Sequence, residues 1–241
     1  MNIWCFGDSH SRYFTVTDQI KNINPVLYLY SIINNPINAA TINGFGKRES
    51  TLNSKKIINE TITKNSVDVL VMNFGQVDVE LGYYYKYYVK KEYLMFVDFA
   101  SYIIDVYISY IKQQPVKIKI VKGINPPVLC YNRDKALQYT KRIITENILD
   151  KKIINTLYND MEYSFPDDIE RTKRHLVFNS LLKKKCKENK ISYFDITKEL
   201  LSENGLIKID FVPSKKDHHL VDSLRTRNLY INSLIETIEG I

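Results

Sequence analysis

Short apolar runs that alternate with helix-prone stretches are the feature that most constrains how this chain can fold. Three of the runs are followed within two residues by a glycine, Gly7, Gly75 or Gly123, as buried strands are where the backbone turns. We expect strands at 3–6, 26–30, 67–74, 118–121 and 191–195, and helices at 54–63, 92–113, from 168 onward and at 220–238. Because strands that alternate with helices form a parallel sheet covered on both faces, the sequence predicts a three-layer α/β/α sandwich.

The chain is long enough to bury one large core. It has 241 residues, of which 44% are hydrophobic, the size of a single globular domain. We find no internal repeat and no low-complexity linker, so we predict one domain over residues 1–241. The stretch at about 133–168 is charged, helix-prone and free of glycine, and we interpret it as a helical insertion.

An open parallel sheet places its functional groups in the loops that follow the strands. The chain has only eight glycines, about half the usual ~7% share, so their positions are informative. Five of the eight fall in these loops: Gly7, Gly44, Gly46, Gly75 and Gly123. We therefore expect function at this edge of the sheet.

The strongest local signal is the sequence Gly-Asp-Ser-His at 7–10, at the end of the first expected strand. A serine at a tight turn that opens a helix lifts its hydroxyl away from the sheet, and its backbone N–H can face a developing oxyanion. A nucleophilic serine also needs a base. The sequence Asp-His-His at 217–219 offers two imidazoles and a carboxylate that can orient the base.

These residues resemble the motifs of the SGNH or GDSL hydrolases, which are serine esterases, lipases and acyltransferases. Phe-Gly-Asp-Ser-His-Ser at 6–11 is similar to the family's first block, which implies that Ser9 is the nucleophile. Asp-His-His-Leu at 217–220 is similar to the fifth block, which implies that Asp217 and His219 complete a triad. The resemblance also implies a five-stranded flavodoxin-like sheet, an acyl-enzyme intermediate, no cofactor and no metal.

Two further blocks of the family supply the oxyanion hole. Asn-Gly-Phe-Gly at 43–46 stands in the place of the second block, and its first glycine, Gly44, is preferred as the N–H donor beside Ser9. Gly-Gln-Val-Asp, after the third strand, resembles the third block, but Val77 stands where the family has a donating Asn. Either Gln76 replaces that donor or the donor is absent.

The fifth block differs from the family pattern Asp-x-x-His, because the histidine lies one residue closer to the aspartate. His219, which precedes leucine as in the family, is favoured as the base over His218. The remaining polar residues of these loops are candidates for substrate contact: Asp8, His10, Asp78, Asn125 and His218.

A tyrosine-rich run at 83–88 follows the third block, in a chain with 18 tyrosines. Aromatic rings can stack on sugars and phenol hydroxyls can bond to sugar hydroxyls, although the same run also suits packing. Relatives with this opening resemble proteins of surface glycan modification. The resemblance therefore implies an acyl ester of a small molecule or glycan as substrate, with water or a sugar hydroxyl as the acceptor.

The formal charge of +7 and a pI near 9.0 favour an anionic partner. Nucleic acid is not favoured, because no helix-turn-helix, zinc-finger or RNA-binding signature occurs. One alternative is a catalytically weak or inactive module of the same fold that binds glycan or another anionic polymer. Another is a metallophosphoesterase, because Asp8-x-His10 also resembles the first metal ligands of calcineurin-like enzymes, but the other motifs of that family are missing.

The cysteines and the N-terminus indicate a cellular location. Cys5, Cys130 and Cys186 are odd in number and far apart, which favours free thiols in a reducing compartment. The N-terminus lacks the basic and apolar regions of a secretory signal, and no apolar run reaches the ~18 residues of a membrane span. We expect a cytoplasmic protein with no membrane span.

Overall fold

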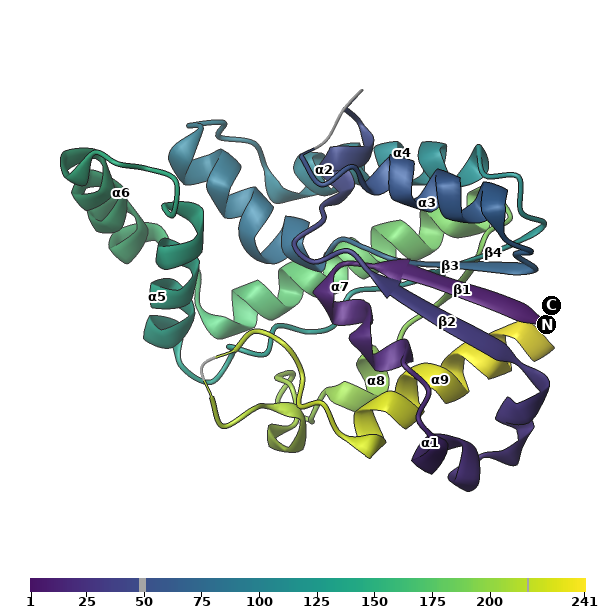
Figure 1. Ribbon diagram of the computed structural model, residues 1–241. Helices are drawn as coiled ribbons and strands as arrows, with labels where there is room; N and C mark the ends of the chain where they lie inside the picture. The colour runs from purple at the N-terminus through teal and green to yellow at the C-terminus, as the bar shows by residue number, and fades with distance from the viewer. Residues whose placement is uncertain (48–50, 216) are drawn as a thin grey trace.

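The computed structural model describes residues 1–47, 51–215 and 217–241. Within them, five parallel strands form a sheet in the order β2-β1-β3-β4-β5 (Figure 1). The strands are β1 (Asn2–Gly7), β2 (Ser31–Pro36), β3 (Val69–Asn73), β4 (Ile118–Lys122) and β5 (Ser192–Phe194). This order confirms the expected five-stranded flavodoxin-like sheet.

Helices connect all the strands. The α-helices are α1 (Asp18–Ile23), α2 (Ile42–Phe45), α3 (Ser54–Lys64), α4 (Phe96–Lys112), α5 (Arg133–Ile144), α6 (Lys151–Ser164), α7 (Asp168–Glu188), α8 (Thr197–Leu200) and α9 (Leu224–Glu239). Shorter turns are the 3-10 segments η1 (Ser9–Phe14), η2 (Pro25–Leu29) and η5 (Ile209–Phe211) and the π-helical segments η3 (Asp78–Gly82) and η4 (Tyr85–Val89). The closing helix begins at Leu224, later than expected, because the Ser223 side chain caps it.

Alternate residues of the central strands face two separate cores. On β3, Leu70 and Met72 pack with apolar residues of α4 and α7, whereas Val69 and Val71 pack with residues of η1 and α9. All five residues of β3 are buried, as expected for a parallel strand covered on both faces. Figure 1 shows α3 and α4 on one side of the sheet and α1 and α9 on the other. The three-layer α/β/α sandwich is therefore confirmed.

The expected strand at 26–30 is wrong. These residues form η2, which begins at Pro25, and the strand follows at Ser31–Pro36. Proline has its φ near −65°, which suits the first position of a helical turn, and the side chains of Tyr28 and Leu29 are exposed. Since β2 lies at the edge of the sheet, it is only partly buried and lacks the apolar pattern of the central strands.

The stretch at 133–168 contains α5 and α6. Both helices lie beyond the carboxyl ends of the strands, at the left of Figure 1. They therefore stand at the edge of the sheet where function was expected.

The three cysteines are buried free thiols in separate parts of the fold. Among the helices of the described residues, none is both long and apolar enough to cross a bilayer.

Candidate active site

Ser9 opens the turn that follows β1. The Asp8 side chain caps this turn by accepting the His10 N–H at 2.9 Å, and the Asp8 carbonyl accepts the Ser11 hydroxyl at 2.8 Å. The Asp8 N–H in turn donates to the carbonyl of Asn73 at the end of β3, at 3.3 Å. These bonds fix the backbone that carries Ser9 against the two central strands.

The three residues expected to form a triad lie within hydrogen-bond distance of one another. His219 Nε2 lies 2.7 Å from Ser9 Oγ, and His219 Nδ1 lies 2.7 Å from Asp217 Oδ1. Asp217 Oδ1 also accepts the His219 N–H at 3.2 Å, which orders this loop. A carboxylate at Nδ1 favours the tautomer whose Nε2 accepts a proton from the serine hydroxyl.

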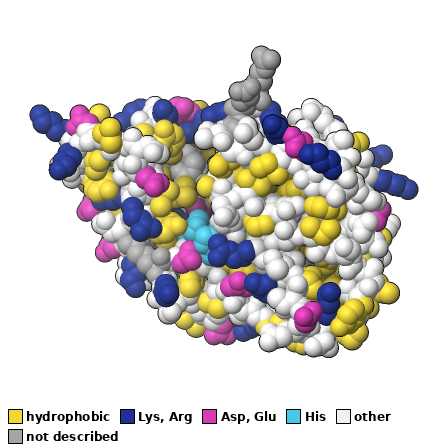
Figure 2. Space-filling model, viewed as in Figure 1, with side chains coloured by type: hydrophobic (Ala, Val, Ile, Leu, Met, Phe, Trp, Pro, Cys, Tyr) yellow, Lys and Arg dark blue, Asp and Glu magenta, His cyan; other side chains and the backbone are white. Residues whose placement is uncertain are grey.

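The electrostatic surroundings suit a neutral base beside an ionised carboxylate. Burial and then the neighbouring His218 lower the pKa of His219, against the opposing effect of Asp217. Burial acts to raise the pKa of Asp217, but hydrogen bonds from His219 outweigh it and the pKa lies below its usual value. The Asp217 side chain is 43% exposed, and Figure 2 shows histidine side chains reaching the surface beside basic and acidic groups. The site is therefore open to solvent.

The oxyanion donors differ from the expectation. The Ser9 N–H has no acceptor among the described residues, so it is available. The Gly44 N–H already donates to Thr41, to the hydroxyl at 3.2 Å and the carbonyl at 3.1 Å. Gln76 is corrected: both hydrogens of its amide are used, toward Glu80 Oε1 at 2.8 Å and the Asn125 carbonyl at 3.1 Å.

Asp8 and Asp78 are buried and support the site. Asp78 accepts the first two backbone N–H groups of α2, at 2.7 and 3.2 Å, and so ties the loop after β2 to the loop after β3. Burial raises the pKa of Asp8 to about 7 and that of Asp78 to about 6. That either carboxyl contacts substrate stays a prediction of the sequence.

Asn125 is likewise buried within the protein. Its amide bonds to the Tyr230 hydroxyl at 2.7 Å and to the Lys122 ammonium at 2.7 Å. The same ammonium lies 4.3 Å from the centre of the Tyr230 ring, and burial lowers the pKa of Lys122 to about 7. Asn125 therefore holds the loop after β4 through these internal bonds.

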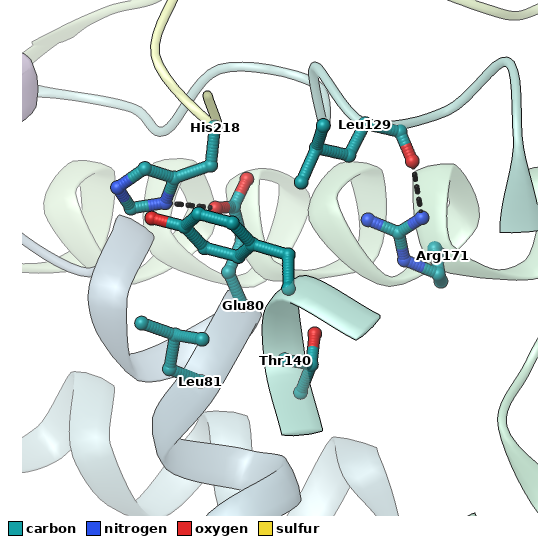
Figure 3. A pocket seen from close by; sticks show the side chains of 7 residues that line it. Glu80, Leu81, Leu129, Thr140, Arg171 and His218 are labelled. Carbon is teal, nitrogen blue, oxygen red and sulfur yellow. Dashed lines mark hydrogen bonds and ion pairs between the residues drawn. The ribbon is translucent and has the colours of Figure 1, made fainter. Parts of the chain in front are cut away.

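All four histidines of the chain gather around this site. The His10 ring stacks on His219 with centroids 4.3 Å apart, and it meets His218 edge-on at 4.7 Å. His218 Nδ1 bonds to Glu80 Oε2 at 2.8 Å, as Figure 3 shows. On the other side of Glu80, His175 Nε2 lies 3.4 Å from Oε1. His10 and His218 are buried, so these two predicted substrate contacts also pack inside the protein.

The histidines are close enough to raise the question of a metal. His10, His218 and His219 each offer a ring nitrogen within 4.8 Å of the others. A zinc ion lies about 2.0–2.1 Å from each histidine nitrogen, in the plane of the ring. The rings of His10 and His219 are stacked at an angle of 28°, so their lone pairs run side by side and do not converge. The arrangement fits a stack of imidazoles better than a metal centre.

The tyrosine run at 83–88 begins directly after η3, continues through most of η4 and packs as an aromatic cluster. Four of its rings, together with Tyr93 and Arg174, line a groove at the surface. The volume of this groove is near 340 Å³. Arg174 lies 5.2 Å from the centre of the Tyr83 ring. The run thus serves packing and also presents rings to a hollow at the surface.

Sequence reasoning missed three residues of this site. Arg12 Nε donates to the Ser9 carbonyl at 2.9 Å, Glu80 bonds to His218, and His175 is buried although the charged Arg174 precedes it. For Glu80 the sequence did offer a signal. It lies four residues after Gln76 on a helical segment, and residues at this spacing share a face, so the two side chains could have been expected to meet.

Comparison with known proteins gives a result at the level of structure alone. No protein-family model matches the sequence, and no curated protein matches it significantly. A carbohydrate acetylesterase from Sinorhizobium meliloti is similar at 12% identity and TM-score 0.57, over 99% of this chain and 98% of that one. The M. smegmatis aryl esterase is similar at 13% identity and TM-score 0.57, over 99% and 98%. A GDSL-like lipase from Bacteroides thetaiotaomicron is similar at 13% identity and TM-score 0.50, over 99% and 88%. At these identities the likeness establishes the fold, so the chain has the fold of the SGNH or GDSL hydrolases.

Proposed function

We propose that this protein is a serine esterase that cleaves an acyl ester through a covalent intermediate on Ser9. The observation that carries the proposal is the pair of 2.7 Å distances that join Ser9 Oγ to His219 and His219 to Asp217. This is the geometry of a nucleophile, its base and the group that orients the base.

The acylation step follows from this geometry. Ser9 Oγ bonds to the ester carbonyl carbon while His219 Nε2 takes the serine proton, and the Ser9 N–H donates to the oxyanion. When the C–O bond to the alcohol breaks, His219 returns the proton to the leaving oxygen, which leaves an acyl group on Ser9. Water then gives a proton to His219 and attacks the acyl carbon, and the proton returns to Ser9 as the acid departs.

We propose an O-acylated glycan as the substrate class. Two features support it: the tyrosine-lined groove, whose rings and Arg174 suit stacking and hydrogen bonding to sugars, and the likeness in fold to a protein described as a carbohydrate acetylesterase. Water is the proposed acceptor because the site is open to solvent. Transfer to a sugar hydroxyl is the alternative, and mass analysis of the products distinguishes the two.

A fluorophosphonate probe tests the nucleophile directly. The parent should be labelled at Ser9, and Ser9→Ala and His219→Ala should lose labelling and at least about a thousandfold in p-nitrophenyl acetate hydrolysis. Ser109→Ala, at an exposed position of α4, is the matched control and should behave as the parent. A folded parent that is neither labelled nor active would instead support the catalytically inactive binding module.

A further inference from the structure

Two adjacent histidines of the site compete for one proton. The rings of His218 and His219 lie 4.2 Å apart, centre to centre, at an angle of 74°. Two imidazolium ions at such a distance, with both rings largely buried, repel each other strongly. At neutral pH, at most one of the two rings therefore carries the additional proton that makes it an imidazolium. Only the other, neutral ring can act as a base.

The environment of the two histidines is unequal. His218 bonds through Nδ1 to Glu80, and both residues are buried. Glu80 also receives a hydrogen bond from Gln76 at 2.8 Å and lies 3.4 Å from His175. A buried carboxylate needs donors and a cation beside it to remain ionised. His219 faces Asp217, whose side chain is 43% exposed to solvent and therefore better hydrated.

We propose that Glu80 keeps the shared proton on His218, so that His219 stays neutral and able to accept the proton of Ser9. Glu80 touches neither Ser9 nor His219 in any hydrogen bond of the described residues, so it is a positioning residue that acts through His218. This inference rests on the proposed function only for its catalytic consequence, because the placement of the proton can be measured without a substrate.

The charged groups around the pair agree with this placement. Burial opposes protonation of His218, but the hydrogen bond and charge of Glu80 on η3 outweigh it, and Asp217 and Asp8 act in the same sense, so its pKa is raised. The Tyr139 ring of α5 covers His218 at 5.1 Å.

The surroundings of the other partners agree as well. Around His219, burial, His218 and Arg12 of η1 lower the pKa against Asp217. The pKa of His10, which faces both rings, is lowered by burial and then by both histidines. Burial acts to raise the pKa of Glu80, yet His175 and His218 bring it well below its usual value.

The arrangement has a consequence that a merely structural role would not produce. Removing a negative charge ordinarily lowers the pKa of a nearby histidine. In Glu80→Gln, however, His218 loses the partner that stabilises its charge, and the proton passes to His219 beside Asp217. The pKa of His219 should therefore rise, by about one pH unit or more.

Nuclear magnetic resonance of the four histidines tests the proposal. In the parent at pH 7, we expect His218 to be an imidazolium and His219 to be neutral, with each signal assigned from a single substitution. In Glu80→Gln the midpoint of the His219 titration should move to higher pH. His175→Gln removes the other histidine beside Glu80 but not the His218 contact, and should move that midpoint much less. A neutral His218 in the parent would overturn the proposal even if Glu80→Gln does not fold.

The pH dependence of ester cleavage supplies the second readout. The acidic limb of kcat/KM should move up with the titration midpoint of His219 in Glu80→Gln. At a pH well below both midpoints, activity relative to its own plateau should fall about tenfold for each pH unit that the midpoint moves. If the acidic limb stays in place in an active and folded Glu80→Gln variant, the proposed role of Glu80 is overturned and the proposed esterase function stands. A parent that shows the expected protonation but cleaves no ester overturns the proposed function and leaves the proton placement standing.

Discussion

The closest backbone approach in the site lies at Gly7, and filling it should displace the nucleophile. A Cβ added at Gly7 would lie 2.4 Å from the carbonyl oxygen of Asn73 and 2.5 Å from Ser11 Cβ. Ordinary contact begins at 3.4 Å, so in Gly7→Ala the turn and β3 must separate by about 1 Å. Ser9 lies in the turn between Gly7 and Ser11, and the shift should move its hydroxyl away from His219 Nε2, now 2.7 Å distant.

The expected loss follows from that displacement. A misplacement of about 1 Å costs about 100-fold in rate, and overpacking of this kind costs about 1–3 kcal/mol of stability. We expect Gly7→Ala to lower kcat/KM for p-nitrophenyl acetate by about that factor and to lower the Tm.

Gly205→Ala is the matched control for this experiment. Gly205 has a φ of +77° and no other atom within 4 Å of an added Cβ, so the substitution should cost about 1–2 kcal/mol of stability through backbone strain while kcat/KM is kept. The comparison separates a loss of stability from a displaced nucleophile. A Gly7→Ala protein with the parent's kcat/KM and Tm would refute the reasoning.

Three further predictions concern the buried charges that support the site. Asp78→Ala leaves two N–H groups of α2 without their acceptor, of which that of Ile42 is buried and that of Asn43 is part-buried. The buried group should cost about 1–3 kcal/mol, which urea unfolding should measure. The raised pKa of Asp8, about 7 against 3.8 when unfolded, means that the folded protein holds this proton longer. Its contribution to stability is therefore lost as pH rises from about 4 to about 7, at up to about 1.4 kcal/mol per unit, and Asp8→Asn should remove that slope. For Lys122 the pKa is lowered to about 7 from 10.5, so the unfolded chain binds more protons and stability should rise from pH 7 to pH 10; Lys122→Met should flatten this rise in the same unfolding series.

The sequence alone determined the elements whose signals are local. The apolar run before Gly75 became β3 because a central parallel strand is buried on both faces and carries continuous apolar sequence. The strand β4 was also predicted, although two of its five residues are lysines. The edge strand β2 gave no such signal, since water solvates one of its sides, and Pro25 instead started a turn where a strand was expected. The positions of Ser9 and His219 were predicted from motifs whose order along the chain matches a known family.

Only the tertiary structure decided what surrounds those two residues. Gln76 and Asn125 are polar residues on the right loops. The packing of β3, β4 and α9 turned the Gln76 side chain toward Glu80 and the backbone of Asn125, and the Asn125 side chain toward Tyr230. Glu80 and His218 are 138 residues apart in sequence, and no local pattern reports a bond of that kind. A hydrogen bond depends on where two atoms lie within a few tenths of an ångström, and that is set by the packing of all the layers together.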